Sequence, residues 1–527
     1  MNRSLRDAMA ALSLSNLCFI SAWQILLNPG HYFYYYWKNY PGFTEIIALV
    51  LDILLLAVLF SVGIAATRRF GKGALAKGAR VLFVLLLVIP LNSIRLGGGS
   101  LNDLDLFTFL RRTQVMVLGC LLLAAILLVL WRWSSVITRI VAPILMILAP
   151  FSLVALSQGV WLAQRHRSDI RLFNKKTPDV AESETEPARR VLWLIFDEMD
   201  QRMLFDARPD GIKFPELDRF RSEAIYADSA YPPAGETLMS MPALTTGRIV
   251  TRAVPSRPDE LMLTFDGSKE AAGWSAQPNI FSAARAAGFR TALIGWYHPY
   301  CRTIGTGLDV CYWEPSISEA NPVLDKLSMG GAMRLWVRAV LFRIPLVFRL
   351  LKSRYMRDLR EQHIVTHQRI LAEARAVVRD RGLNLTLIHF PVPHHPFIYD
   401  PARNVLSPAT DNDYAGNLEL VDKILGELRR EMEAAFSWNK TAVLITSDHW
   451  WRDSTPVNGR RDHRVPFLLK LAGQPEGVTY PRAFNTVLTH DLVLAYLSGE
   501  LSSKDDMIQW MDRHRSFAES PLTKNLP

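Results

Sequence analysis

Residues 234–248 read Ala234-Gly-Glu-Thr-Leu-Met-Ser-Met-Pro-Ala-Leu-Thr-Thr-Gly-Arg248, and this stretch says more about the fold than any other. A turn at Gly235 precedes Thr237, which the pattern places in the first turn of a helix. Free backbone N–H groups and the positive end of the helix dipole favour an anion at such a position. A hydroxyl there can act as a nucleophile beside a bound phosphate. The alternative is that Thr237 only caps the helix, a position that threonine often fills.

Short apolar segments separated by helical periodicity surround this stretch. Buried strands are predicted at 191–196, 290–295, 385–389 and 441–446, and helices at 279–287, 355–380 and 414–436. Alternating strands and helices predict a doubly wound α/β sheet, which places ligand sites at the carboxyl ends of its strands.

Polar residues follow three of these strands. They are Asp197-Glu198, His389 with the later pair His394-His395, and Asp448-His449. Each group alone fits a capped loop, but together with Thr237 they indicate one site at the edge of the sheet. Mixed carboxylate and imidazole ligands suit zinc or manganese better than calcium, which prefers oxygen alone.

In their order along the chain, these motifs resemble the alkaline phosphatase/sulfatase superfamily over about residues 190–500. The resemblance implies that Thr237 is the nucleophile. It implies a metal held by Asp197, Glu198, Thr237, Asp448 and His449. It further implies that His394 is a catalytic residue beside the substrate or its leaving group, with His395 a bystander. Substrate contacts are implied for His463, which precedes Arg-Val-Pro, for His298 and for Arg248.

Departures from the sulfatase pattern bear on the reaction. Sulfatases convert the first residue of Cys/Ser-x-Pro-x-Arg to formylglycine, whereas this chain has Thr237, Met239 and Met241 at the three defined positions. Threonine cannot give that aldehyde. The sulfate-binding lysine of Gly-Lys-x-His is also replaced, because Trp296 follows Gly295 here. The chain is more similar to the membrane-bound phosphoethanolamine and phosphoglycerol transferases, which use a threonine nucleophile.

This second resemblance implies transfer of a phospholipid head group to a glycan or lipid of the cell envelope through a covalent phospho-threonine. One alternative is hydrolysis at the same site, by a membrane-tethered phosphodiesterase or a sulfuric ester hydrolase. A further alternative is a pseudoenzyme that binds glycan or lipid without turnover, which Trp296 and Trp450 beside the site favour.

The 527-residue chain has a hydrophobic content of 50% and a mean hydropathy of +0.10, and the excess of apolar residues lies in its first third. Apolar runs cover roughly 10–28, 44–66, 80–97, 114–131 and 137–160, each near the ~20 residues that cross a bilayer. We therefore expect a bundle of about five helices over residues 1–161, a linker over 162–190 and a catalytic domain over 191–527.

Basic residues orient the bundle. The segment 67–80 between the second and third runs carries five basic residues and no acidic one. Under the positive-inside rule this segment and the N-terminus are cytoplasmic. The interpretation is a multi-pass protein of the inner membrane with a periplasmic catalytic domain. The remaining basic charge of the net +10 lies largely in 334–352, which fits a helix on an anionic lipid surface or an ordinary packed helix, and not a nucleic-acid site.

The four cysteines fit this topology. Cys18 and Cys120 lie within apolar runs, where cysteines pack as small apolar residues. Cys301 and Cys311 lie in the large domain, and an oxidising compartment would allow a disulfide between them. A metal pair is the alternative.

Overall fold

The computed structural model describes residues 3–28, 33–38, 42–69, 73–97, 113–165, 188–316, 327–342, 344–454 and 461–515, together with 457 and 459. The chain forms two compact units. The first comprises 1–29, 39–171 and 325–352, and the second comprises 30–38, 172–324 and 353–527. Most of the predicted linker, residues 166–187, lies outside the described residues.

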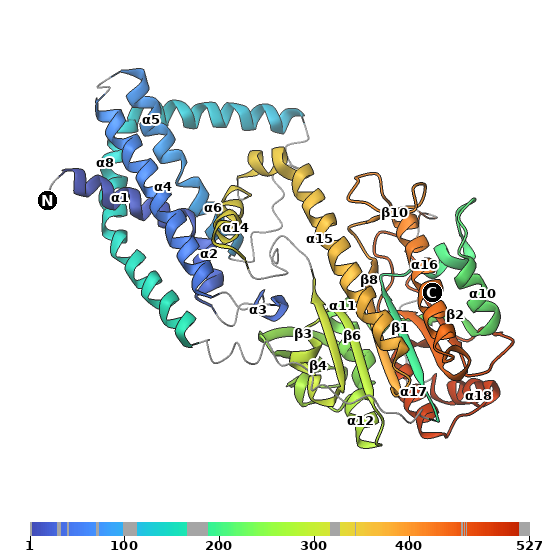
Figure 1. Ribbon diagram of the computed structural model, residues 1–527. Helices are drawn as coiled ribbons and strands as arrows, with labels where there is room; N and C mark the ends of the chain where they lie inside the picture. The colour runs from blue at the N-terminus through green and yellow to red at the C-terminus, as the bar shows by residue number, and fades with distance from the viewer. Residues whose placement is uncertain are drawn as a thin grey trace. The chain divides into compact units, whose positions relative to one another are not determined.

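The first unit is helical (Figure 1). Its helices are α1 (Arg3–Cys18), α2 (Ile20–Leu26), α4 (Phe43–Arg69), α5 (Ala74–Leu85), α6 (Val88–Gly97), α8 (Thr113–Arg165) and α14 (Met329–Leu341). Among the described residues, Phe43–Ala66 and Val117–Leu162 are long and apolar enough to cross a membrane. The bent pair Ser4–Cys18 and Ile20–Leu26 makes a third span if it counts as one. The five-span count stays a prediction.

The outer surfaces of α4 and α8 are apolar. Leu59 on α4 is 67% exposed, and Leu128 and Ile147 on α8 are 70% and 68% exposed. Exposed apolar surface of this extent is typical of helices that face lipid. These two helices therefore support a membrane anchor.

The fourth and fifth apolar runs both lie in α8, which is two helices joined across a kink. The backbone leaves helical geometry at Trp133, with φ −112° and ψ 15°, between the two runs. The predicted turn at this point is therefore a sharp break between two helical segments. The second segment follows closely, since the hydroxyl of Thr138 donates to the carbonyl of Ser134 at 2.8 Å.

The basic segment 334–352 is divided between α14 and the start of α15 (Pro345–Arg379). Ala332, Trp336 and Val340 recur every four residues, and all three are buried in the apolar cluster that α4 also enters. The indole of Trp336 donates to the carbonyl of Glu45 at 2.8 Å. Of the two alternatives for this segment, α14 fits the packed helix.

A nine-stranded sheet is the centre of the second unit (Figure 1). Its strands are β1 (Val191–Asp197), β2 (Ile225–Tyr231), β6 (Thr291–Tyr297), β7 (Val310–Pro315), β8 (Leu385–Pro393), β11 (Ala442–Ser447), β12 (Val465–Lys470), β13 (Val478–Tyr480) and β14 (Phe484–Asn485). The order is β13-β2-β12-β11-β1-β8-β6-β7, and β14 pairs with β2. The five strands from β11 to β7 are parallel. All four predicted strands are confirmed as members of this parallel group.

Helices cover both faces of the sheet. The side chains of β1 alternate between two apolar clusters, one on each face, and each cluster contains residues of several helices. Trp193 and Ile195 enter the cluster that contains residues of α11 (Thr237–Thr246), α12 (Ile280–Ala286), α17 (Thr489–Ser498) and α18 (Lys504–His514). Leu192 and Leu194 enter the opposite cluster, with residues of α10 (Pro215–Glu223), α15 and α16 (Tyr414–Ala434). The fold is therefore the predicted doubly wound α/β architecture.

Two features of this unit were not predicted. The first is a three-stranded antiparallel sheet of β3 (Val250–Arg257), β4 (Glu260–Phe265) and β5 (Ala271–Gly273). The second is the position of residues 33–38, which include the short helix α3 (Phe33–Tyr36) and belong to the second unit although they lie between the first two apolar runs. Tyr35 is fully buried in the apolar cluster that contains α11.

Candidate active site

The parallel pairing of β1 with β11 brings two polar loops together. Phe196 lies opposite Ser447 at the ends of these strands. The hydroxyl of Ser447 donates to the carbonyl of Phe196 at 2.7 Å and accepts from the amide of Met199 at 2.8 Å. Oδ1 of Asp448 accepts hydrogen bonds from two backbone amides. These contacts fix the orientation of the Asp448 carboxylate.

Asp197, Asp448 and His449 converge at this sheet edge. Nε2 of His449 lies 3.2 Å from Oδ1 of Asp197 and 3.7 Å from Oδ2 of Asp448. One ligand atom from each of the three residues lies within 4.8 Å of the others, and all three side chains are buried. Nδ1 of His449 donates to the carbonyl of Trp450 at 2.9 Å, which leaves the lone pair on Nε2.

The residues present fit a divalent metal. Oδ1 of Asp197, Oδ2 of Asp448 and Nε2 of His449 are all buried without a hydrogen bond. Buried polar atoms without partners are costly, and a bound cation would remove that cost. Burial and the negative charge of Asp448 raise the pKa of Asp197 to about 7. Burial lowers the pKa of His449, but the carboxylates of Asp448 and Asp197 outweigh this effect and raise it to about 10. Both shifts reflect excess buried negative charge.

Thr237 reaches this group from the start of α11. Its hydroxyl donates to Oδ2 of Asp197 at 3.3 Å. The N-cap of α11 is Glu236, and Thr237 is the first residue of the helix itself. The structure therefore rejects the interpretation of Thr237 as a helix cap. Gly235 is required nearby because a Cβ there would lie 2.5 Å from the ring of Trp450.

His298 is buried against the backbone of Thr237. Nε2 lies 3.1 Å from the carbonyl of Thr237, so this nitrogen carries the proton. Nδ1 then accepts a hydrogen bond of 2.8 Å from the hydroxyl of Tyr35. The side chain has no exposed surface. These two contacts suit His298 to positioning Thr237, and its implied contact with substrate stays a prediction.

His389, one of the polar residues that the sequence assigned to this sheet edge, lies beside Asp197 and Asp448. It is fully buried on β8, and its Nε2 is 4.0 Å from Oδ2 of Asp197 and 4.0 Å from Oδ2 of Asp448. The other ring nitrogen lies 3.1 Å from the carbonyl of Trp296. Burial lowers the pKa of His389 to about 4, so the imidazole is neutral at pH 7. The signal in the sequence was a histidine within an apolar strand, to which we assigned no individual role.

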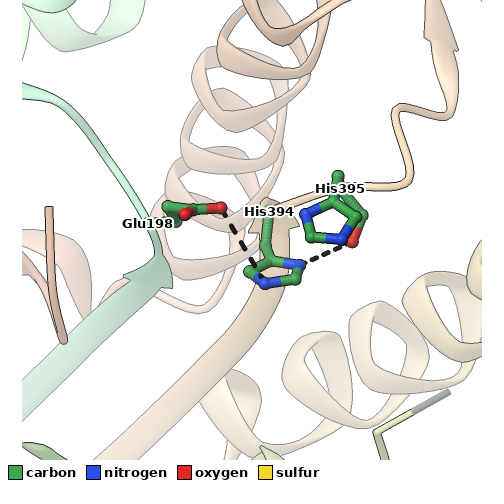
Figure 2. A group of neighbouring side chains, drawn as sticks. All are labelled: Glu198, His394 and His395. Atoms are coloured by element: carbon green, nitrogen blue, oxygen red, sulfur yellow. Dashed lines mark hydrogen bonds and ion pairs between the residues drawn. The ribbon is translucent and has the colours of Figure 1, made fainter. Parts of the chain in front are cut away.

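Glu198 and His394 belong to a second group, together with His395 (Figure 2). Glu198 has a positive φ of 67°, which is strained for a side chain of this size, directly after β1. Nε of Arg452 donates to Oε1 of Glu198 at 3.0 Å. The structure therefore places the Glu198 carboxylate with Arg452 and the two histidines, outside the group formed by Asp197, Asp448 and His449.

His394 is oriented as a hydrogen-bond acceptor. Nδ1 contacts the carbonyl of His395 and therefore carries the proton, so Nε2 accepts from Arg452 at 3.1 Å. Burial lowers the pKa of His394 well below its ordinary value. A neutral imidazole with this tautomer fits a positioning role better than the role of proton donor to a leaving group.

The remaining predicted site residues lie further out. Arg248 follows the opposite end of α11 from Thr237, and its guanidinium lies 3.8 Å from the centroid of the Phe265 ring. Its implied contact with substrate stays a prediction. The ring of His463 lies against that of Trp450, with centroids 4.2 Å apart.

The cysteines of the large domain are paired. A disulfide joins Cys301 and Cys311, which excludes the alternative of a metal pair. Cys18 is a free, buried cysteine, and the side chain of Cys120 lies outside the described part of the chain.

Comparisons with known proteins identify the family of the second unit. The family model described as Sulfatase matches residues 189–499. No curated protein matches the chain. Among solved structures, the PsFucS1 sulfatase from Pseudoalteromonas sp. is 18% identical, with a TM-score of 0.42 over 61% of this chain and 70% of that one. The phosphonate monoester hydrolase of Agrobacterium radiobacter is 13% identical, with a TM-score of 0.38 over 59% and 74%. Because the family model covers more than half of its length, the chain belongs to the sulfatase family.

Proposed function

We propose that this protein is a metal-dependent phosphotransferase that moves a phospholipid head group to a glycan or lipid acceptor of the cell envelope. The observation that carries the proposal is the contact between the Thr237 hydroxyl and Asp197 at 3.3 Å. This hydroxyl lies at the start of α11, beside buried ligand atoms without partners. Nucleophile, anion-favouring helix terminus and metal ligands therefore meet at one point.

Asp197, Asp448, His449 and the Thr237 hydroxyl would hold the metal, and two carboxylates with an imidazole favour zinc or manganese. When bound, the metal would lower the pKa of the hydroxyl and offset negative charge on the phosphoryl oxygens. Oγ1 of Thr237 loses its proton to solvent and forms a bond to phosphorus. The bond from phosphorus to the diacylglycerol oxygen breaks, and that oxygen leaves with the electron pair and takes up a proton from solvent. The hydroxyl oxygen of the acceptor then loses its proton to solvent and forms a bond to phosphorus. The bond from phosphorus to Oγ1 of Thr237 breaks, and Oγ1 takes up a proton from solvent.

The membrane helices support a lipid donor. Phe43–Ala66 and Val117–Leu162 would keep the enzyme at the bilayer that contains its substrate. The disulfide between Cys301 and Cys311 favours a catalytic domain outside the cytoplasm. We therefore propose a multi-pass inner-membrane protein with a periplasmic active site.

The test uses the full chain, because Tyr35 is part of the catalytic core and would be lost from a fragment that begins near residue 190. The purified protein in nanodiscs that contain fluorescent phosphatidylethanolamine or phosphatidylglycerol would be assayed for diacylglycerol, with intact-mass analysis of the protein. We expect diacylglycerol release and a phosphorylated adduct, both lost in Thr237→Ala. Thr251→Ala, which alters an exposed threonine of β3, is the matched control.

Other outcomes would favour the other candidates. Formation of diacylglycerol with transfer of the phosphorylated head group to water, and without a modified acceptor, would indicate a phosphodiesterase. Cleavage of a chromogenic sulfate ester, but of no phosphodiester, would contradict phosphotransfer and indicate a sulfuric ester hydrolase. A metal-free protein without turnover would contradict the proposal and indicate a binding role.

A further inference from the structure

Arg452 lies among three side chains that could otherwise bind a metal. Its Nε and its backbone amide donate to the same oxygen of Glu198, at 3.0 and 3.1 Å. Its terminal nitrogen donates to Nε2 of His394 at 3.1 Å. Glu198 and His394 belong, with His395, to the second group of potential metal ligands. The guanidinium thus lies where a second divalent cation would make its contacts.

The side chains of Glu198 and His394 in this second group already have hydrogen-bond partners. Figure 2 shows His394 between the carboxylate of Glu198 and the backbone carbonyl of His395. The His395 carbonyl accepts the Nδ1 proton of His394, and Arg452 donates to the opposite nitrogen of that ring. Both nitrogens of His394 are therefore engaged without a metal. This differs from the first group, in which ligand atoms are buried without hydrogen bonds.

The charges of the two groups balance with one metal. Asp197, Asp448 and Glu198 are three buried carboxylates at adjoining positions, since the amide of Glu198 donates to Asp448. One divalent metal and one guanidinium neutralise three carboxylates when the histidines are neutral. Arginine supplies this charge permanently, because its guanidinium does not lose its proton in proteins.

The guanidinium also has donors left for a ligand. Two of its five N–H groups are used in the contacts with Glu198 and His394. The side chain is 46% exposed, whereas that of Glu198 is 5% exposed. A planar guanidinium with free N–H groups is well suited to pair with two oxygens of a phosphoryl group.

We propose that Arg452 acts in place of a second metal, so that the protein holds one divalent cation and binds the anionic oxygens of its ester substrate through this guanidinium. The proposal rests on the proposed function, because it assumes a metal at Asp197, Asp448 and His449. It adds a substrate-binding residue to that site and fixes the number of metals.

The experiment measures metal content and anion binding on the same samples of the full chain. Metal per chain is determined by elemental analysis after loading with manganese or zinc, and the Kd of inorganic phosphate by calorimetry. Wild type should hold one metal. Arg452→Ala should weaken phosphate binding by about 10- to 100-fold, the range expected for loss of a charge-assisted hydrogen bond. It should also take up a second metal, because Glu198, His394 and His395 lose their cation.

Three further variants control for folding and charge. Arg403→Ala removes an exposed arginine that pairs with Asp400, and it should leave both measurements unchanged. Arg452→Lys keeps the charge but not the planar arrangement of N–H groups. Its affinity for phosphate should lie between those of wild type and Arg452→Ala, and it should hold one metal ion per chain. Glu198→Gln combined with Arg452→Ala should lose the second metal.

The failures of the two proposals are distinguishable. The role of Arg452 would be overturned if wild type held two metal ions per chain. It would also be overturned if Arg452→Ala and Arg403→Ala bound phosphate with the same Kd. A wild type that holds no metal after loading would overturn the proposed function itself.

Discussion

The hydroxyl of Tyr35 donates a 2.8 Å hydrogen bond to Nδ1 of His298, and the opposite nitrogen of that ring donates to the carbonyl of Thr237. Tyr35 lies 263 positions before His298 in the chain, between the first two apolar runs. Arg302 donates to the Tyr35 carbonyl at 2.8 Å and holds the segment in place. A residue close to the membrane-spanning part of the sequence thus supports the backbone of the candidate nucleophile.

Tyr35→Phe should reduce kcat more than it changes KM. The substitution leaves Nδ1 of His298 buried without a donor, at a cost of about 1–3 kcal/mol in the free energy of unfolding. It also frees the His298 ring that contacts Thr237. Loss of one hydrogen bond worth about 1.4 kcal/mol in the activation free energy corresponds to a fall of about 10-fold in kcat, which is the change we expect. The measurements are kcat and KM on a chromogenic phosphodiester, with thermal unfolding.

Tyr36→Phe is the matched control, because the Tyr36 hydroxyl pairs with that of Tyr297 at 3.3 Å and not with His298. Equal kcat values for Tyr35→Phe and Tyr36→Phe would show that the contact between Tyr35 and His298 has no role in catalysis.

His389→Gln should weaken metal binding. Nε2 of His389 lies 4.0 Å from one carboxylate oxygen of Asp197 and of Asp448, so the imidazole helps to define the space between them. Loss of groups that orient metal ligands typically costs about 10- to 100-fold in affinity. Metal affinity would be measured by competition with a chromogenic chelator.

His367→Gln replaces another buried histidine, which lies on α15, and it controls for the loss of a core side chain. If both variants bind metal with the same affinity, His389 has no specific influence on the metal site.

The disulfide offers a test of topology. Chain-entropy estimates give a stabilisation of about 2–3 kcal/mol for a loop as short as that between Cys301 and Cys311. In protein purified from native membranes without reductant, alkylation after denaturation should modify Cys18 but neither Cys301 nor Cys311. The double Cys301→Ser/Cys311→Ser variant should unfold at a lower temperature than Cys18→Ser. Alkylation of Cys301 and Cys311 without prior reduction would contradict an extracytoplasmic domain.

Asp422→Asn should stabilise the protein at neutral pH but not at acidic pH. Burial, with the charges of Glu216 and Asp218, raises the pKa of Asp422 from 3.8 to about 6, although its Oδ1 accepts from the amide of Leu217 at 2.8 Å. The folded state therefore binds the proton more tightly than the unfolded state. The contribution of Asp422 to stability is therefore fully present below about pH 4 and is lost as the pH rises through about 6.

Asparagine keeps an acceptor for Leu217 without the buried charge. The expected gain for Asp422→Asn is up to about 3 kcal/mol above pH 7, since each pKa unit corresponds to about 1.4 kcal/mol. It should vanish near pH 4. Unfolding by urea at both pH values would measure the gain, with the exposed Asp210→Asn as control. A gain of equal size at both pH values would exclude the ionisation of Asp422 as its cause.

Much of the candidate site could be predicted because it follows from local patterns. The apolar composition of residues 191–196, 385–389 and 441–446 determined three neighbouring strands, and parallel pairing alone brings the residues after them to one edge. The glycine turn at 235 and the helical residues after it placed Thr237 at a helix start. The threonine, at the position that the resemblance assigns to the nucleophile, disfavoured the formylglycine chemistry of sulfatases.

Other features were decided only by tertiary structure, because they depend on residues distant in sequence. The pairing of Glu198 with Arg452 spans 254 positions, so the residues around Glu198 could not reveal that its carboxylate is already matched by a cation. The hydrogen bond to Nδ1 of His298 comes from Tyr35, which the hydropathy pattern assigns to a loop between apolar runs. Strand composition and helix starts are set by neighbours along the chain, whereas burial and ion pairing are set by neighbours in space.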